Sequence, residues 1–356
     1  MNKRDLVKVG FKHAHNNFME SLYLKTGIDK TKPIVVYGIV NEYCNYKCRY
    51  CEFWRMPSYM NEISIEDWKN ALMSLKEYIG PYHIEFSGGE PFLKEGFIDL
   101  IEFCYQNELK WGVTTNGSAL TDSIIKRLVA ARPFNINISI DSHVAEVHDF
   151  SRGIVGSFER ITKQLKKLIT YRNDQGLSFP IILKPTVHAA NLHVITDFPD
   201  WASELGATAV NFQPLDRWTP ETYDELWINE ERIKELEVVV ESLISQKQAG
   251  SPILNSIMTL NLWPAHFREE KAPESAGACR VGLRNYFIRP NGDVEVCWYY
   301  SPIGNVNEQN AREIWESDIA KLRRQETTEC DRLCLFTCLS QKTILDKVKM
   351  ALTLIS

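Results

Sequence analysis

The sequence lacks the features of an exported or membrane-embedded protein, and it lacks any excess of positive charge. Its N-terminus, MNKRDLVKVGFKHAHNN, contains no apolar run typical of a signal peptide. No uninterrupted apolar segment approaches the ~20 residues that a membrane span requires. The net charge of −5 over 356 residues gives no electrostatic reason to expect a nucleic-acid partner. These absences predict a cytoplasmic protein that binds neither membranes nor nucleic acid.

Cysteine, in contrast, is plentiful, because the chain contains nine. Cytoplasmic thiols stay reduced, so this number suggests metal or redox chemistry more than a disulfide framework. Three of the cysteines fall within the eight residues CNYKCRYC, at positions 44, 48 and 51. A second group lies near the C-terminus and consists of Cys279, Cys297, Cys330, Cys334 and Cys338. The remaining one, Cys104, lies within a helical pattern and is expected in the core.

Short β-like runs alternate with helical segments over much of the chain. The runs are IVVYGIV (34–40), HIEF (83–86), WGVTT (111–115), NINISID (135–141), IILKPTV (181–187) and TAVNFQ (208–213). Ser64 with Asp67, and Thr121, are capping signals for helices between them. Six strand–helix units predict a parallel sheet wrapped by helices, and six is fewer than the eight of a closed barrel. The predicted fold class is therefore α/β, an open, partial (β/α)6 TIM-type barrel.

The polar motifs all occur where these runs end. The first cysteine group follows the first run, SGGEP (87–91) follows the second, TTNGS (114–118) ends the third and SID (139–141) ends the fourth. In parallel α/β architectures the carboxyl ends of the strands carry the active site. The sequence therefore predicts one site assembled from several loops.

The pattern changes after residue 215. An acidic helical stretch is followed by NYFIRPNGDVEVCWYY, two alternating runs around Asn291–Gly292 that predict a β-hairpin with Cys297 on its second strand. A single helix is expected over 311–324. The chain is thus expected to end in a small cysteine-rich α+β extension. The expected divisions are an N-terminal helical segment (1–33), the barrel (34–215), a helical linker region (216–275) and the extension (276–345).

The C-x3-C-x2-C group, Cys44, Cys48 and Cys51, allows three interpretations. Structural zinc normally takes four ligands, and no further Cys or His occurs between Cys51 and His83. A [4Fe–4S] cluster held by three thiolates leaves one iron open to an outside ligand. Three buried cysteines without a metal are the remaining interpretation.

CNYKCRYC, with an aromatic residue before its last cysteine, resembles the signature of the radical S-adenosylmethionine (SAM) superfamily, and later motifs match in order over about 34–215. The resemblance implies that Cys44, Cys48 and Cys51 hold a [4Fe–4S] cluster whose open iron is chelated by SAM. It also implies reductive cleavage of SAM to a 5′-deoxyadenosyl radical, which abstracts hydrogen from substrate. A flavodoxin or ferredoxin is the kind of electron donor that the resemblance implies.

SGGEP resembles the family's GGE segment, which contacts the SAM amino group. Two glycines let the main chain approach closely, and Glu90 can accept a hydrogen bond from an ammonium group. The resemblance implies that the cofactor-binding residues are Gly88, Gly89, Glu90, Asn116, Ser139, Asp141 and Arg152. Ser139 and Asp141 are expected as hydroxyl partners, and Arg152 as the partner of the SAM carboxylate, with a surface arginine as its alternative. No catalytic residue is singled out.

The spacing from Cys279 to Gly292 and on to Cys297 resembles the start of the SPASM and shorter twitch extensions of radical SAM enzymes, which bind auxiliary [4Fe–4S] clusters. A full SPASM domain carries seven cysteines for two clusters. The five cysteines here predict one auxiliary cluster, with zinc as the alternative. One thiol is then spare, either as a buried cysteine or as a hydrogen-atom donor.

Three functions follow from these patterns. The first is an oxidative radical SAM enzyme, a dehydrogenase or bond-forming maturase in which the auxiliary cluster accepts an electron or orients substrate. The second is a redox-neutral epimerase that uses the spare cysteine. The third, of another class, is an iron–sulfur or zinc scaffold or electron carrier. The 43 residues before Cys44 are too few for a leader-binding domain, which favours a small-molecule substrate or a peptide presented by another chain.

Overall fold

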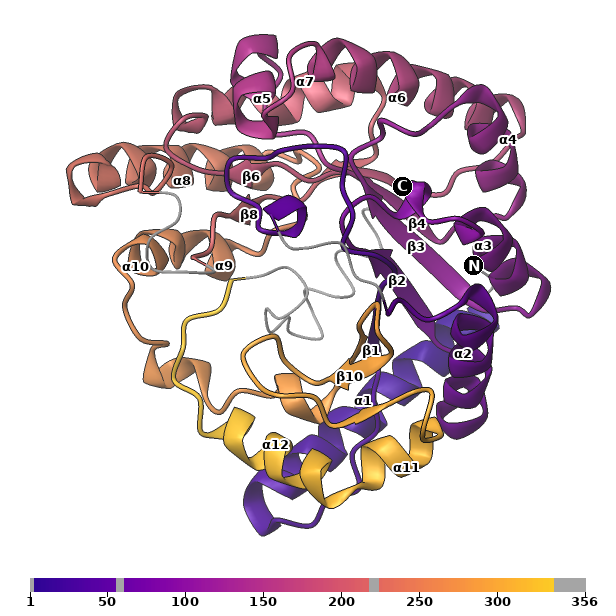
Figure 1. The fold of residues 1–356 in the computed structure, drawn as a ribbon. Coiled ribbons are helices and arrows are strands. Elements are labelled where there is room, and N and C mark those ends of the chain that lie inside the picture. Colours follow the sequence, from indigo (N-terminus) through magenta and orange to yellow (C-terminus); the bar gives the residue numbers. More distant parts are fainter. Residues whose placement is uncertain (1–2, 56–60, 218–223, 336–356) are drawn as a thin grey trace.

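The computed structural model describes residues 3–55, 61–217 and 224–335. Its centre is a sheet whose parallel strands follow one another in chain order (Figure 1). These strands are β1 (Val35–Ile39), β2 (His83–Ser87), β3 (Lys110–Thr115), β4 (Asn135–Ile138), β5 (Ile181–Leu183) and β7 (Ala209–Val210). A separate parallel pair, β6 (Thr186–Val187) and β8 (Gln213–Pro214), continues two of the predicted runs. The predicted parallel sheet is confirmed.

Helices cover the outer face of this sheet. They are α2 (Ile65–Ile79), α3 (Phe97–Gln106), α4 (Asp122–Ala130), α5 (Ala145–Arg152), α6 (Ser157–Asp174) and α7 (Phe198–Leu205). The capping box of Ser64 with Asp67 begins α2, and the Thr121 side chain caps α4, as predicted. Outward strand residues pack against these helices, as Phe86 does edge-on against Trp68. The partial TIM-type barrel is therefore confirmed.

Further helices surround the open part of the barrel. They are α1 (Lys3–Thr26), α8 (Ile233–Gln248), α9 (Ile257–Asn261) and α10 (Trp263–Phe267). Short 3₁₀ helices span Phe53–Arg55, Pro91–Leu93, Leu192–Asp197, Glu230–Arg232, Glu274–Ala276 and Val281–Leu283. Buried Glu20 on α1 forms ion pairs with Arg280 and Arg284, so the first helix is tied to the C-terminal region. None of the helices in the described part of the chain is long and apolar enough to cross a membrane.

The C-terminal hairpin joins the barrel sheet. It is formed by β9 (Asn285–Ile288) and β10 (Asp293–Glu295), with β11 (Gly304–Asn305) beyond them. β9 runs parallel to β1, with Val36 opposite Tyr286, so one continuous sheet connects the barrel with the extension. The sequence predicted the hairpin but not this pairing, because register between strands 250 residues apart leaves no local pattern.

Two local predictions in this region are wrong. Cys297 does not lie on the second hairpin strand, because β10 ends at Glu295 and the chain bends at Val296 and Cys297. The helix expected over 311–324 is divided into α11 (Ala311–Glu316) and α12 (Asp318–Thr328). The division falls at Ser317, which adopts an extended conformation and caps the second helix with its side chain.

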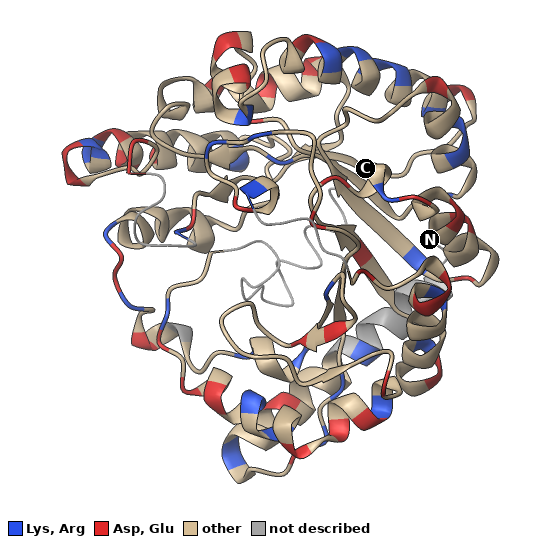
Figure 2. Cartoon of the chain, viewed as in Figure 1, with Lys and Arg blue, Asp and Glu red and all other residues tan. Residues whose placement is uncertain are grey.

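Charged residues lie mainly on the outer helices, and the central strands carry few of them (Figure 2). This distribution follows from the high cost of removing a charge from water. Charges that are buried near the strand ends are therefore exceptional, and they need close partners.

Candidate active site

The loop that carries Cys44, Cys48 and Cys51, called the cysteine loop below (residues 41–52), follows β1. Three glycines from other segments let it lie close to the barrel. A β-carbon added at Gly88 would lie 2.4 Å from the Asn41 carbonyl oxygen, and one at Gly89 would lie 2.0 Å from that of Tyr43. One at Gly153 would lie 2.2 Å from the carbonyl oxygen of Lys47. The glycines of SGGEP therefore make room for the cysteine loop, and their expected contact with SAM stays a prediction.

The three thiols of the loop lie within electrostatic reach of one another. Burial raises the pKa of Cys44 to about 11 and that of Cys51 to about 12. Hydrogen-bond donors nevertheless point at the sulfurs, since the Tyr46 amide lies 3.4 Å and the Asn116 side-chain amide 3.6 Å from the Cys44 Sγ. Buried thiols that converge and receive donors suit thiolate ligands, whose protons are displaced on metal binding. The donor set therefore fits an iron–sulfur cluster.

Glu90 connects the ends of β2 and β3. Its fully buried carboxylate accepts hydrogen bonds from the Thr115 hydroxyl at 2.6 Å and from the Asn116 amide at 2.7 Å. Burial raises its pKa to about 7. Asn116 in turn contacts Cys44 and Asn45, so Glu90 fixes the turn that faces the first thiol. Its expected contact with the SAM amino group is not tested by this geometry.

Asp141 and Arg152 form a buried ion pair below the cysteine loop. The guanidinium meets both carboxylate oxygens at 2.7 Å, and its Nη1 lies 3.9 Å from the Cys48 Sγ. The Tyr50 hydroxyl donates to the same carboxylate at 2.7 Å. The surface-arginine alternative is therefore wrong, since Arg152 is only 6% exposed. Half-buried Ser139 lies just after β4, and the predicted cofactor contacts of all three residues remain predictions.

Two histidines that sequence reasoning did not place in the site border Asp141. His148 accepts a hydrogen bond from the Asp141 amide through its Nδ1, and the ring of His188 lies 5.8 Å from that of Tyr50. Burial lowers the pKa of both histidines to about 4, so they are neutral near pH 7. The position of His188 directly after the fifth β-like run was the signal available in the sequence.

The structure also brings the C-terminal thiols together. Cys279 lies within electrostatic reach of Cys330, and Cys334 within reach of both Cys297 and Cys330. Burial raises the pKa of Cys334, and the nearby carboxylate of Asp216 raises it further. These four thiols come from three separate segments of the chain. Cys338, the fifth predicted ligand, lies outside the described residues.

Within the described ranges, no three His, Cys, Asp or Glu side chains converge on a position suited to a single metal ion. Structural zinc holds all its ligands within ~2.3 Å of one point, whereas an iron–sulfur cluster distributes its thiolates over several irons. Because Cys338 is not described, the zinc alternative for the C-terminal thiols stays open.

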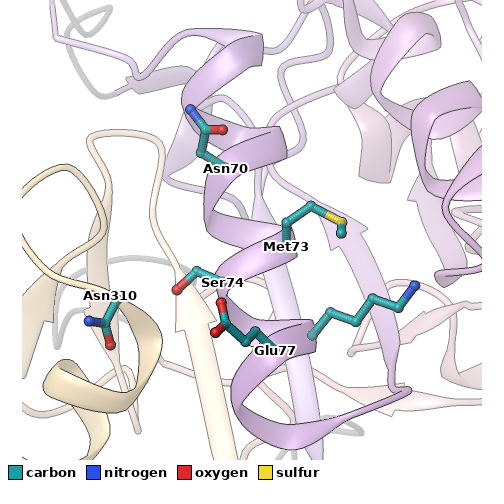
Figure 3. A pocket seen from close by; sticks show the side chains of 6 residues that line it. Asn70, Met73, Ser74, Glu77 and Asn310 are labelled. Carbon is teal, nitrogen blue, oxygen red and sulfur yellow. The ribbon is translucent and has the colours of Figure 1, made fainter.

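A cavity of about 220 Å³ is lined by one thiol of the first group and by residues that neighbour the second group. Its lining consists of Tyr50, Cys51, Glu52, Phe53, Thr186, Gln213, Pro214, Leu215, Asp216, Arg289 and Trp298. Cys51 belongs to the first group, and Trp298 directly follows Cys297 of the second. Asp216 accepts a hydrogen bond from the Tyr299 hydroxyl at 2.9 Å and lies within electrostatic reach of Cys334. A second hollow, on the outer side of α2 between Ser74 and Asn310, contains no cysteine (Figure 3).

Comparison with known proteins agrees with this architecture. Residues 39–189 match the model of the radical SAM superfamily, and residues 279–339 match that of SPASM, an iron–sulfur cluster-binding domain. The chain therefore belongs to the radical SAM superfamily and carries a C-terminal SPASM domain. It is a radical SAM enzyme whose cofactors are a [4Fe–4S] cluster, S-adenosylmethionine and the additional iron–sulfur content of the SPASM domain.

Its relatives have several activities. An AdoMet-dependent heme synthase of Methanosarcina barkeri is 28% identical over 291 residues, which are 77% of this chain and 79% of the relative. The mycofactocin maturase MftC of Mycobacterium tuberculosis is 24% identical over 74% of this chain, and the match spans only 64% of the maturase.

Solved structures show the same fold. SuiB of Streptococcus suis bound to S-adenosylmethionine superposes with a TM-score of 0.65 at 18% identity, over 85% of this chain and 70% of SuiB. The enzyme anSMEcpe with bound AdoMet gives a TM-score of 0.63 at 17% identity, over 84% of this chain and 83% of its own. Likeness at these identities establishes the architecture and leaves the substrate of this chain open.

Proposed function

We propose that this chain is an oxidative radical SAM enzyme, a dehydrogenase or bond-forming maturase, that acts on a group held in the cavity between its two sets of thiols. The observation that carries the proposal is the lining of this cavity. Its lining includes Cys51 together with Asp216 and Trp298, which neighbour C-terminal thiols. A substrate in this position borders both redox centres, and such an arrangement suits removal of a hydrogen atom followed by removal of an electron.

In this proposal Cys44, Cys48 and Cys51 hold the [4Fe–4S] cluster. When bound, the cluster and S-adenosylmethionine supply the one-electron chemistry that removes a hydrogen atom from substrate. The residues proposed to bind SAM at the strand ends are Gly88, Gly89, Glu90, Asn116, Ser139, Asp141 and Arg152. Two separate buried contacts tie these strand ends to the cysteine loop: Glu90 holds Asn116, which contacts Cys44, and the Asp141–Arg152 pair contacts Tyr50 and Cys48.

The C-terminal thiols Cys279, Cys297, Cys330 and Cys334, with Cys338 as a further candidate, are proposed to hold an auxiliary cluster that accepts the substrate electron. A flavodoxin or ferredoxin is the proposed donor to the first cluster. Tyr299 lies within electrostatic reach of Cys334, and Tyr300 lies within reach of Cys279, Cys297 and Cys330. Aromatic rings beside the thiols limit the access of water, which helps to set the potential of an iron–sulfur centre.

The size of the cavity suggests what enters it. Its volume of about 220 Å³ is below the ~300–1,000 Å³ of typical small-molecule pockets, so the reacting group is about the size of an amino-acid side chain. One similar structure is that of SuiB bound to precursor peptide SuiA, and one relative is an AdoMet-dependent heme synthase. We therefore propose that the substrate is a peptide or a small molecule that inserts one such group into the cavity.

The first test is anaerobic reconstitution with quantitation of iron and sulfide, while SAM cleavage to 5′-deoxyadenosine is followed in parallel. Wild type is expected to hold about eight irons. A variant with Cys44, Cys48 and Cys51 changed to alanine is expected to hold about four and to lose SAM cleavage. Cys104→Ala, a buried cysteine on α3 outside both groups, serves as the control and is expected to keep all the iron.

Other results would change the proposal. Zinc bound with about four irons in wild type would make the C-terminal thiols structural, and the oxidative reaction would lose its electron acceptor. Iron without any SAM cleavage would favour a scaffold or electron carrier. Turnover in deuterated water tests the remaining alternative, the redox-neutral epimerase. A product with one inverted carbon that has gained deuterium, and with no net loss of hydrogen, indicates an epimerase.

A further inference from the structure

The buried ion pair of Asp141 and Arg152 touches the cysteine loop at two points. The Tyr50 hydroxyl donates to the Asp141 carboxylate at 2.7 Å, and Arg152 Nη1 lies 3.9 Å from the Cys48 Sγ. The Arg152 guanidinium also faces the ring of Tyr50, at 5.6 Å from its centroid. Asp141 and Arg152 are 0% and 6% exposed. These contacts lie on the inner side of the loop, directly at a proposed cluster ligand.

The pair is anchored from several directions. The Thr186 amide donates to an Asp141 carboxylate oxygen at 2.9 Å, and the Asn191 side-chain amide donates to the Asp141 carbonyl at 2.9 Å. The two charged contacts between Asp141 and Arg152 are both 2.7 Å long, as in the strong bidentate pairs that arginine forms with carboxylates. A guanidinium held in this way keeps a fixed distance from the neighbouring sulfur.

The two charges of the pair do not contact Cys48 equally. Arg152 points its Nη1 at the Cys48 Sγ at 3.9 Å, whereas the Asp141 carboxylate accepts hydrogen bonds from Tyr50, Thr186 and Arg152 itself. The histidines next to this pair, His148 and His188, are neutral near pH 7 because burial lowers the pKa of each to about 4. The charged group in contact with the Cys48 sulfur is therefore a guanidinium, which carries a positive charge.

We propose that Arg152, held by Asp141 and Tyr50, is a positioning residue that raises the reduction potential of the cluster bound through Cys48. The proposal rests on the proposed ligation by Cys48 and goes beyond it. A buried positive charge and a donor beside a ligand sulfur stabilise the more negative, reduced state of a cluster. Arg152 thereby makes the cluster easier to reduce by the external donor.

The test is the midpoint potential of the SAM-responsive cluster, measured by an EPR-monitored redox titration of the full reconstituted chain. The variants are Arg152→Gln, Arg152→Lys and Tyr50→Phe. Arg152→Gln removes the charge and is expected to shift the potential to a more negative value. Arg152→Lys keeps the charge and is expected to recover part of the shift. Tyr50→Phe loosens the pair and is expected to shift the potential less than Arg152→Gln.

The chain offers a matched control. Arg324, 2% exposed, forms an ion pair with Asp29 at 2.6 Å, and neither residue is a neighbour of the cysteine loop. Arg324→Gln breaks a buried pair of the same kind and is expected to leave the potential unchanged. If Arg152→Gln has the wild-type potential, or if Arg324→Gln shifts it equally, the inference is wrong. If Cys48→Ala retains the full iron content and SAM-responsive signal, the proposed ligation itself is wrong, which is a different result.

Discussion

The two groups of cysteines in this chain are built in opposite ways. Cys44, Cys48 and Cys51 lie within one loop of eight residues, whereas Cys279, Cys297, Cys330 and Cys334 come from segments spread over 56 residues. The first group is defined by local spacing and then fitted to the barrel by glycines. The second group exists only because a hairpin, a 3₁₀ helix and the end of α12 pack together. The difference shows that similar metal chemistry can depend on very different amounts of tertiary structure.

The charges beside the two groups also differ in sign. Cys48 of the first group faces the guanidinium of Arg152, whereas Cys334 of the second faces the carboxylate of Asp216. The guanidinium favours the thiolate and the carboxylate opposes it. Since nearby charge shifts the potential of a cluster, the two centres are expected to be tuned in opposite directions.

The largest effect is expected on removal of iron. Ligands that join distant segments restrict the unfolded chain more than ligands within one short loop do. Chelation of the iron should therefore increase the rate of amide hydrogen exchange in residues 279–335 at least about tenfold, which corresponds to a free energy of local opening that is lower by ~1.4 kcal/mol. The exchange rates in β2 and β3 should change little. Exchange measured by mass spectrometry on holo and apo protein checks this. Equal loss of protection in both regions would contradict the contrast.

The next effect concerns the fit of the cysteine loop. Gly153→Ala places a methyl group 2.2 Å from the Lys47 carbonyl oxygen, so the loop must move away from α5. We expect loss of most of the iron held by the first group, on the order of half the total, while the SPASM iron remains. Iron content and SAM cleavage are the measurements.

Gly176→Ala is the matched control for this change. Gly153 and Gly176 have nearly the same positive φ, 66° and 65°, but no atom lies within 4 Å of the methyl position at Gly176. Both variants therefore carry the same backbone strain of ~1 kcal/mol. If both lose iron to the same extent, strain and not the contact with Lys47 is responsible.

A smaller effect is expected at Asp216. Asp216→Asn removes the negative charge beside Cys334 and should shift the potential of the auxiliary cluster to a more positive value. This shift is opposite in sign to the one expected for Arg152→Gln at the first cluster. The redox titration that resolves both clusters provides the measurement. A shift of the same sign in the two variants would show that the contrast in charge does not set the potentials.

The last prediction concerns the barrel, away from both groups. Glu85 accepts hydrogen bonds from Asn135 and Asn137, and burial raises its pKa from 4.5 to about 7. The folded state thus holds a proton that the unfolded state has lost, so the free energy of unfolding should fall as pH rises from 4.5 to 7, by up to about 3 kcal/mol. His83, with its pKa lowered to about 4, gives the opposite slope, and Lys184 faces the same carboxyl.

Glu85→Gln isolates this contribution, because His83 and Lys184 are present in both proteins. The difference in unfolding free energy between wild type and variant, measured on apo protein by urea denaturation, should change across pH 5 to 8. Wild type should lose stability relative to the variant as pH rises. A constant difference over this range would show that Glu85 does not titrate as its burial indicates.

Much of the barrel was predictable from the sequence because its signals are local. The run predicted at 83–86 corresponds to β2 (His83–Ser87), and the capping box at Ser64 begins α2 as expected. The run at 181–187 divides into β5 and β6 around Lys184 and Pro185, since proline cannot donate to a strand ladder. The expectation failed at Ser317, where an extended cap interrupts a helical pattern.

The candidate site was only partly predictable. The sequence identified Asp141 and Arg152 as separate cofactor contacts, but the structure shows them paired with each other. The sequence did not place His188 in the site, and its burial beside Tyr50 was missed. These relations depend on which helix ends meet which strand ends, and no local pattern encodes them.

By itself the sequence determined the strands and caps of the barrel, the spacing of Cys44, Cys48 and Cys51 and the resemblance that they carry. Those features arise from interactions between residues a few positions apart. Only the tertiary structure decided the pairing of β9 with β1, the convergence of the C-terminal thiols and the contact of Arg152 with Cys48, which are 104 residues apart. Such contacts form only when packing fixes distant segments together, because their geometry is set by the whole core and not by any one segment.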